Sequence, residues 1–245
     1  MDKIVGRNPV LEAIRAGRNF EKLVVQQNAG GSIQKILDQA GERHIPVQHV
    51  DKSALDRLAG NGGHQGVLAF VSDFCYAQIE DMLAAARDKN EDPLILVLDG
   101  MEDPHNLGAI LRSAEGAGVH GVIIPLRRSV GITDVVAKTS SGAIEHIPVA
   151  REPNIREALK KLQNAGLWAA ALDMDGERYF EKDLTGGLAL VIGGEGGGLR
   201  RLVKETCDFA VSIPMYGRLA SLNASAAAAV TLYEIKRQRI MQTRG

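Results

Sequence analysis

Residues 94–114 read LILVLDGMEDPHNLGAILRSA, and this stretch decides the fold. Its first five residues are all apolar, which is typical of a short strand buried on both faces of a parallel sheet. Asp103 and Pro104 then supply a helix cap and a first-turn proline, so a helix is predicted over 107–117. A strand that passes into a helix through a short loop is the repeating unit of an α/β fold.

The same alternation continues to the end of the chain. Further strands are predicted at 121–125, 167–172, 188–192 and 209–213, and further helices at 133–140, 155–165 and 225–239. Strands that alternate with helices imply a parallel sheet covered by helices on both faces.

The first 73 residues predict a separate, small α/β domain. A helix is expected to begin at Asn8 and Pro9 and to end at Gly17. A second, amphipathic helix is predicted over 32–40, strands at 23–25, 46–50 and 67–71, and a glycine-rich loop at 60–63. Residues 74–92 are expected to link this domain to a larger one that spans 93–245.

Composition limits the class of protein without identifying it. The chain is 45% hydrophobic and 24% charged with a net charge of −1, so charge alone does not favour a nucleic-acid partner. Its apolar runs are too short to cross a membrane, and its N-terminus lacks a secretory pattern, which predicts a cytoplasmic protein. Cys75 and Cys207 lie far apart and outside any metal-binding cluster, so neither a disulfide framework nor a bound metal is expected.

The loop and helix after the first strand carry the pattern Asp-Pro-x-Asn-x-Gly-x-x-x-Arg. Asn106 lies at the mouth of the predicted helix, and Arg112 follows six residues later, nearly two turns along a similar face. A capped helix with one solvated arginine explains each piece taken separately. The complete pattern, at the carboxyl end of a strand, favours a ligand site.

A second loop, GGEGGG at 193–198, also follows an apolar strand. Its glycines let backbone N–H groups approach a ligand closely, although a flexible turn is the alternative. Leu199 breaks the dinucleotide fingerprint, and Leu199 with Arg200 breaks the phosphate-loop pattern. Glu195 repels phosphate, so it suits a cationic or hydroxyl-bearing ligand.

A third loop precedes the last predicted helix. Ser221, Asn223 and Ser225 place hydroxyl and amide groups at the start of that helix, where they can cap it or bind a polar ligand.

Taken in order, the three loops resemble motifs 1, 2 and 3 of the SpoU/TrmH branch of the SPOUT methyltransferases, from about residue 94 to 239. Residues 6–13, GRNPVLEA, and 64–67, HQGV, resemble the substrate-binding domain of the bacterial 23S rRNA (guanosine-2′-O-)-methyltransferase subgroup. That small domain is itself similar to ribosomal RNA-binding proteins. The resemblance implies methyl transfer from S-adenosylmethionine to a ribose 2′-hydroxyl of RNA, with 23S rRNA favoured and tRNA as the alternative.

The family also implies features that the residue patterns do not. These are a C-terminal trefoil knot that binds the cofactor in a bent form, and a homodimer with its active sites at the interface. The residues that the resemblance places at the cofactor are Gly193, Gly194, Gly198, Ile213, Met215 and Leu222.

The resemblance makes Arg112 the catalytic arginine, with Asn106, Glu195, Ser221 and Asn223 orienting substrate, cofactor or Arg112. Arginine side chains stay protonated in proteins, so we expect Arg112 to grip the neighbouring phosphate and the hydroxyl, with a role as base left open. In the small domain, His64 and Gln65 either touch RNA or form a structural turn.

Two alternatives come from other classes of protein. A nicotinamide-dependent oxidoreductase is disfavoured by the two broken fingerprints. A non-catalytic RNA-binding relative is disfavoured because it has no need to keep Asn106, Arg112, Glu195 and Asn223 together.

Overall fold

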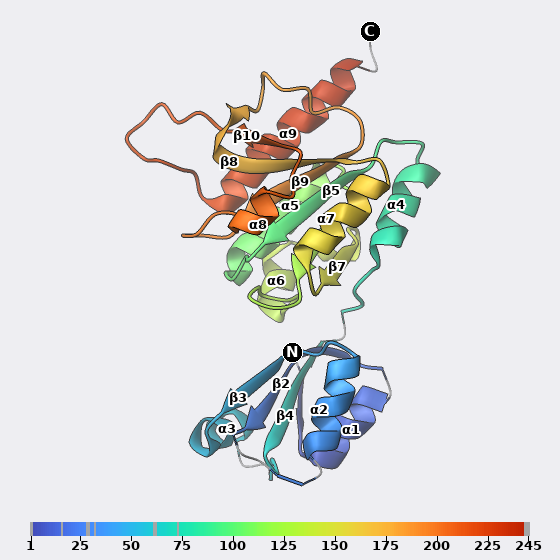
Figure 1. Cartoon of the computed structure of the whole chain (residues 1–245), viewed down its shortest axis with the longest axis vertical. Coiled ribbons are helices and arrows are strands. Elements are labelled where there is room, and N and C mark those ends of the chain that lie inside the picture. The colour runs from blue at the N-terminus through green and yellow to red at the C-terminus, as the bar shows by residue number, and fades with distance from the viewer. Residues whose placement is uncertain are drawn as a thin grey trace. The chain divides into compact units, whose positions relative to one another are not determined.

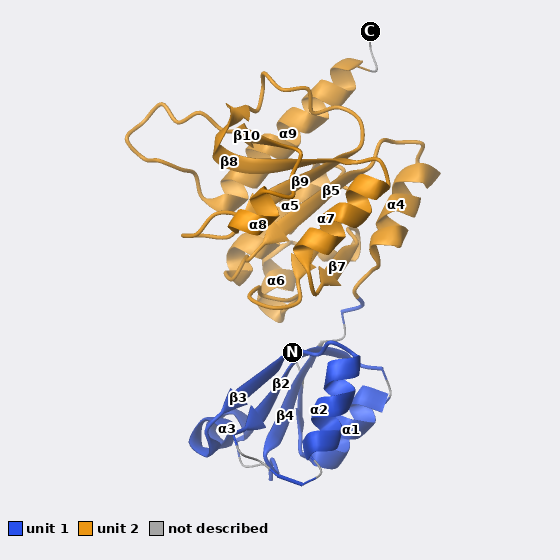
Figure 2. Cartoon of the chain, in the orientation of Figure 1, with its two compact units in different colours: residues 1–75 blue, residues 76–245 orange. Residues whose placement is uncertain are grey.

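The computed structural model describes residues 2–15, 17–27, 30–31, 33–60, 63–72 and 74–242, which fall into two compact units, residues 1–75 and 76–245 (Figures 1 and 2). The predicted loop at 60–63 is described only at its two ends, because Asn61 and Gly62 lie outside the described residues. Ser32, the first residue of a predicted helix, lies outside them too, as do Met1, Asp73 and residues 243–245 at the predicted domain ends.

Unit 1 is a four-stranded mixed sheet in the order β1-β4-β2-β3, in which β2 and β3 are parallel and the other pairs antiparallel. Helices α1 and α2 bury apolar side chains such as Val10, Ile33 and Ile36 with residues of the sheet. Leu55 of α3 packs against Val24 and Leu68 in a second cluster. The elements are β1 (Asp2–Val5), α1 (Arg7–Arg15), β2 (Asn19–Gln26), α2 (Ile33–Glu42), β3 (Val47–Val50), α3 (Lys52–Ala59) and β4 (Val67–Ser72).

Unit 2 is built on a six-stranded sheet in the order β10-β8-β9-β5-β6-β7, and every neighbouring pair is parallel. The predicted α/β fold with a parallel sheet is therefore confirmed. The strands are β5 (Leu94–Asp99), β6 (Gly121–Pro125), β7 (Val149–Glu152), β8 (Trp168–Arg178), β9 (Leu188–Gly193) and β10 (Phe209–Ser212). The helices are α4 (Ile79–Asp88), α5 (Pro104–Gly116), α6 (Asp134–Thr139), η1 (Ala143–Glu145), α7 (Ile155–Asn164), α8 (Arg201–Lys204) and α9 (Ala224–Gln242).

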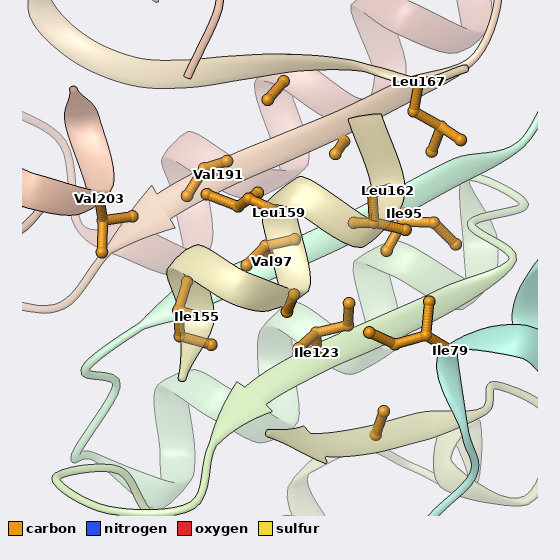
Figure 3. Close-up of a cluster of buried hydrophobic side chains, with 14 of the residues drawn as sticks. Ile79, Ile95, Val97, Ile123, Ile155, Leu159, Leu162, Leu167, Val191 and Val203 are labelled. Carbon is orange, nitrogen blue, oxygen red and sulfur yellow. The ribbon is translucent and has the colours of Figure 1, made fainter. Parts of the chain in front are cut away.

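Helices cover both faces of this sheet. Figure 3 shows one face, where Ile155, Leu159 and Leu162 of α7 lie over the strands that carry Val97 and Val191. Helix α5 packs against α6 and α9, which lie behind the sheet in Figure 1. Because both faces are covered, all six residues of β5 are buried, and only the last of them, Asp99, is polar.

The segment 74–92, expected to link the domains, contributes helix α4 to unit 2. Its Ile79, labelled in Figure 3, and its Met82 are fully buried in the same hydrophobic cluster, and Ala77 forms a parallel bridge with Ala150. The apolar spacing that made this segment amphipathic is thus used against the sheet. The boundary between the two units therefore falls at residues 75 and 76, and most of the expected linker belongs to unit 2.

Helix α9 is tied to the start of β5 and of β9 by its last turns. The Arg239 guanidinium donates to the carbonyls of Asp92 at 2.7 Å and Pro93 at 3.3 Å, and to that of Gly186. Gln238 accepts a hydrogen bond from the Leu184 amide at 2.8 Å. None of the helices in the described part of the chain is long and apolar enough to span a membrane.

Candidate active site

The loops that follow β5, β9 and β10 meet at one edge of the sheet, since parallel strands present their carboxyl ends on the same side. A cavity of about 760 Å³ lies between the loops after β9 and β10, part of β8 and the start of α9. Small-molecule sites are usually about 300–1,000 Å³, so a ligand the size of a nucleoside fits here. The lining residues are 172–175, 192–199, 204, 213, 215, 220–224 and 227.

Asn106 connects the three predicted loops. Its amide nitrogen donates to Asp103 at 2.9 Å and to Glu195, and its oxygen accepts from the Asn223 amide at 3.1 Å. Asn223 in turn accepts from the backbone of Ser225 at 2.8 Å and so caps α9. One amide therefore joins residues that lie 89 and 117 positions away in the chain.

The helix cap beside Asn106 behaves as the sequence predicts. Asp103 accepts a hydrogen bond from the His105 amide at 3.0 Å, and Pro104 occupies the first turn of α5. Hydrogen bonds from the His105 backbone and the Asn106 side chain lower the pKa of Asp103, so it stays ionised and keeps Asn106 oriented.

Two glycines of the loop after β9 allow backbone segments to touch. A Cβ atom on Gly194 would lie 2.1 Å from the Gly100 carbonyl oxygen, and one on Gly193 would lie 2.1 Å from the Gly198 carbonyl carbon. Gly198 also holds a φ of 61°, which a side chain would disfavour. Gly197 is different, because a Cβ atom there would meet open space.

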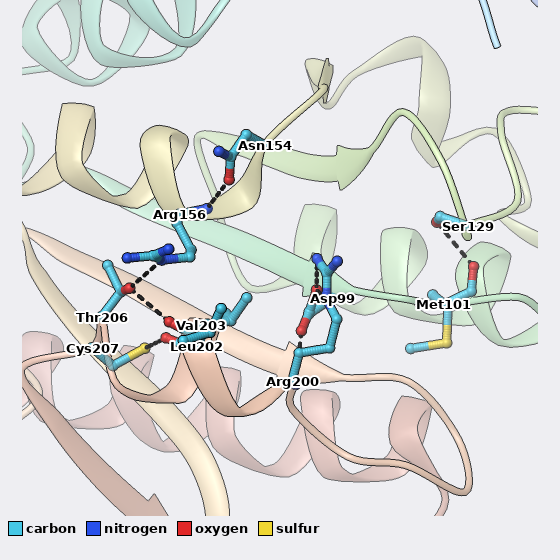
Figure 4. A network of polar contacts seen from close by, with 10 residues as sticks. All are labelled: Asp99, Met101, Ser129, Asn154, Arg156, Arg200, Leu202, Val203, Thr206 and Cys207. Carbon is cyan, nitrogen blue, oxygen red and sulfur yellow. Dashed lines mark hydrogen bonds and ion pairs between the residues drawn. The ribbon is translucent and has the colours of Figure 1, made fainter.

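A buried carboxylate holds this loop against β5. Asp99 accepts hydrogen bonds from the Arg200 amide at 3.0 Å, from its Nε at 2.8 Å and from its Nη2, as Figure 4 shows. The Asp99 side chain is fully buried, whereas that of Arg200 is half exposed. Sequence patterns missed this pair, although a carboxylate that ends an apolar strand is itself a signal of a buried partner.

Charged side chains stand at the β8 side of the cavity. Lys204 donates to Asp173 at 2.8 Å and to Asp175 at 3.1 Å, and these hydrogen bonds raise the pKa of Lys204. Burial alone would raise the pKa of Asp173, but the bonds from Lys204 and from the Asp175 amide lower it overall. The motif patterns did not single out these three residues.

The structure brings most of the predicted site residues together. The cavity wall contains Glu195, Ser221 and Asn223 together with Gly193, Gly194, Gly198, Ile213, Met215 and Leu222. Asn106 reaches this wall through its hydrogen bonds to Glu195 and Asn223. Arg112 does not line the cavity of its own chain; it is exposed on α5, with its guanidinium 3.5 Å from the Ser141 hydroxyl.

In unit 1, the structure decides between the two interpretations of His64. The side chain is buried; its Nδ1 accepts from the Gly66 amide at 2.9 Å, and its Nε2 lies 2.7 Å from Asp56. Arg7 donates to the Gln65 carbonyl at 2.8 Å. His64 therefore organises a turn.

Metal-ligating and thiol side chains are not gathered at the cavity. Among the described residues, no three His, Cys, Asp or Glu side chains are grouped to hold a metal ion. Burial raises the pKa of the Cys207 thiol to about 12, which keeps it protonated and unreactive near neutral pH.

Comparison with known proteins assigns both units. Residues 93–233 match the SpoU rRNA methylase family, and residues 3–77 match the RNA 2′-O ribose methyltransferase substrate-binding domain. The chain is 45% identical over 241 residues to YacO of Bacillus subtilis, whose name assigns it to the TrmH family of tRNA/rRNA methyltransferases. The match covers 97% of this chain and 96% of that protein.

Two crystal structures share the fold. The SpoU methyltransferase AviRb from Streptomyces viridochromogenes, solved in complex with S-adenosylmethionine, is 26% identical with a TM-score of 0.62, covering 98% of this chain and 90% of AviRb. An RNA 2′-O ribose methyltransferase is 27% identical with a TM-score of 0.56, covering 97% of this chain and 88% of that one.

The contact between Gly194 and Gly100 generates a first prediction. Gly194→Ala must displace one of the two loops, and overpacking of this kind costs about 1–3 kcal/mol, so we expect S-adenosylmethionine to bind about tenfold more weakly or worse. Isothermal titration calorimetry measures this. Gly197→Ala is the matched control and should bind as the wild type does, because its methyl group meets no atom within 4 Å. Equal losses in both variants would contradict the assigned contact.

A second prediction concerns the buried Asp99. Arg200→Ala removes the cation while the carboxylate stays buried, which we expect to lower the free energy of unfolding by about 2–4 kcal/mol. The neighbouring Arg201 forms an exposed ion pair with Glu205, so Arg201→Ala should cost about 1 kcal/mol or less. Urea denaturation compares the two variants, and similar stabilities would show that the Asp99 pair does not hold the loop.

Proposed function

Because the chain belongs to the SpoU rRNA methylase family, we propose that it transfers a methyl group from S-adenosylmethionine to the ribose 2′-hydroxyl of a guanosine in 23S rRNA. The resemblance inferred from the three loops is thereby confirmed, and the oxidoreductase alternative falls. The observation that carries the proposal is the junction of Asn106, Glu195 and Asn223 on the wall of the glycine-lined cavity.

The cavity suits the cofactor that this family uses. Glycines at 193 and 194 bring backbone groups to its wall, and Ile213, Met215 and Leu222 add an apolar surface for an adenine ring. We assign these residues and Gly198 to cofactor binding. The cofactor supplies an activated methyl group on a sulfonium, so the reaction needs no metal to activate it.

The protein must then orient the ribose hydroxyl and receive its proton. The Asn106 amide nitrogen donates to Oε1 of Glu195, and Oε2 has no partner among the described residues. We assign to that oxygen the hydrogen bond from the 2′-hydroxyl, with Asn106 and Asn223 holding the carboxylate in place. Ser221, exposed on the same wall, is assigned to substrate orientation.

Arg112 is assigned as the group that grips the phosphate next to the target ribose and its hydroxyl. Its guanidinium presents five donors in a fixed fork that matches phosphate geometry. Its position outside the cavity of its own chain supports a homodimer in which the partner completes each active site.

Exposed apolar side chains support the same dimer. Tyr216 and Leu219 in the loop after β10 are 86% and 76% exposed, and Tyr233 on α9 is 55% exposed. Large apolar groups gathered on one loop and the helix that follows it are expected at a subunit interface. We place the trefoil knot of the family in this same C-terminal region and the enzyme in the cytoplasm, where its RNA substrate is.

Residues 1–73 are proposed to bind the RNA and present it to the catalytic domain at 93–245. The match of residues 3–77 to a substrate-binding domain supports this division of roles. The choice of rRNA over tRNA goes furthest beyond the relatives, since the name of the Bacillus subtilis relative includes both RNAs.

Transfer of label decides among these substrates. The protein is incubated with methyl-tritiated S-adenosylmethionine and with separate, unmodified pools of rRNA and tRNA, and the labelled nucleoside is identified after digestion. We expect 2′-O-methylguanosine from 23S rRNA. Label in tRNA would support the second candidate, a tRNA ribose methyltransferase, and RNA binding without any label would support a non-catalytic RNA-binding relative.

Arg112→Ala tests the catalytic assignment. We expect methyl transfer to fall at least about a hundredfold, because the transition state loses a charged, bidentate partner. Cofactor affinity, measured by calorimetry, should stay unchanged. Arg112→Lys is the matched control: it keeps the charge without the fork and should recover only part of the rate. Parallel loss of rate and cofactor affinity would count against the assignment.

A further inference from the structure

A second, smaller cavity adjoins the first. Its volume is about 190 Å³, and it shares Gly194, Glu195, Gly197 and Gly198 with the larger cavity. The shared wall is the loop after β9, so a ligand that spans both cavities passes Glu195. The remaining lining residues come from the ends of β5 and β6 and from the loops that follow them, together with Arg200: Asp99, Gly100, Glu102, Pro125, Arg127 and Arg128.

Arg127 and Arg128 stand out among these residues. Both are exposed, and neither forms a hydrogen bond or an ion pair with any residue that the structure describes. Each guanidinium therefore keeps its full set of donors available. A single solvated arginine is common on protein surfaces. Two adjacent arginines that line a cavity beside the candidate active site favour binding of an anionic ligand.

The loop that carries these arginines is held firmly. The Ser129 hydroxyl donates to the Met101 carbonyl at 2.9 Å, as Figure 4 shows, and the Val130 amide donates to the same carbonyl at 2.8 Å. Arg128 adopts a φ of 57°, a conformation that is unfavourable for a residue with a side chain. The tertiary contacts maintain this conformation, so the backbone from which the two arginine side chains extend is held against the loop after β5 before any ligand binds.

The lining of the small cavity carries three arginines and three carboxylates, so its formal charges balance. Arg200 pairs with Asp99, whereas Asn106 donates a hydrogen bond to Glu195 without neutralising it. Glu102 and Glu195 are both exposed to water. The capacity to bind an anion therefore lies in Arg127 and Arg128, the lining arginines that form no ion pair with a described residue.

We infer that Arg127 and Arg128 bind a backbone phosphate of the RNA strand beside the target ribose. This inference rests on the proposed function, which brings a ribose to Glu195 on the wall shared by the two cavities. The phosphates attached to that ribose lie within one nucleotide of it, so one of them reaches the neighbouring cavity. Contacts to phosphate fix the register of a nucleic acid on a protein without reading its sequence.

The test measures RNA binding and cofactor binding in the same variants. Arg127→Gln/Arg128→Gln is compared with the wild type in filter binding of unmodified 23S rRNA and tRNA transcripts across a salt series. We expect affinity to fall about tenfold to a hundredfold for every RNA that the wild type binds, since hydrogen bonds from arginine to phosphate are charge-assisted. The salt dependence should weaken by about 0.7 in log–log slope for each single-stranded phosphate that the variant no longer neutralises.

Three controls make the result specific. Lys160→Gln/Lys161→Gln removes the same charge from α7, away from both cavities, and should leave affinity and slope unchanged. Arg127→Lys/Arg128→Lys keeps the charge and should restore most of the slope. Cofactor affinity and melting temperature should not change in the arginine variants, because the two arginine side chains form no hydrogen bond or ion pair with the described residues. The lysine control loses only the exposed ion pair between Lys160 and Glu157, which contributes about 1 kcal/mol or less.

The outcomes separate this inference from the proposed function. Wild-type methylation of RNA with unchanged binding by the glutamine variant would overturn the phosphate site and leave the function intact. Loss of binding limited to RNAs with one base at the target position would also overturn it, because that pattern belongs to base recognition. Arginine-dependent RNA binding without methylation would support the phosphate site and overturn the function. A wild type that binds no RNA would overturn both.

Discussion

The arrangement of the site depends on the buried carboxylate of Asp99. It is held by the backbone and the guanidinium of Arg200, 101 residues further along the chain, and this joins the end of β5 to the loop after β9. Moving that loop would strand a charge in the protein interior, at a cost of several kcal/mol, roughly the size found for broken buried ion pairs. The contact between Gly194 and Gly100 follows from this attachment, since the two loops are drawn together where a side chain would not fit.

Asn106 joins the polar side chains of the loops that this ion pair holds in place. A side-chain amide offers a donor and an acceptor at one end, and Asn106 uses both, toward Glu195 and toward Asn223. Replacement of either function would leave a neighbour without its partner. The larger cavity and the small cavity lined by Arg127 and Arg128 share Glu195, so one carboxylate lies beside both.

Much of the fold and of the candidate site could be predicted from the sequence, wherever a pattern extends over enough residues. Unbroken apolar runs predict the strands at 94–98 and 188–192, whereas β1 and β7 escape prediction, because two of the four residues in each are charged and leave no apolar run. Motif spacing singles out Asn106, Glu195 and Asn223, which the structure brings together. It could not pair Asp99 with Arg200, since nothing in a single sequence indicates which distant cation meets a buried acid. Nor does spacing indicate that Arg112 lies outside the cavity of its own chain.

The position of α9 has a consequence for protein synthesis. The cavity wall is finished by Asn223, and α9, the last helix described, is then fastened by Arg239 to backbone near the starts of β5 and β9. During translation the N-terminal parts of a chain emerge first. The nascent polypeptide thus carries every strand of the described sheet while the larger cavity still lacks a side. The wall of this cavity is therefore completed only once α9 has left the ribosome and docked.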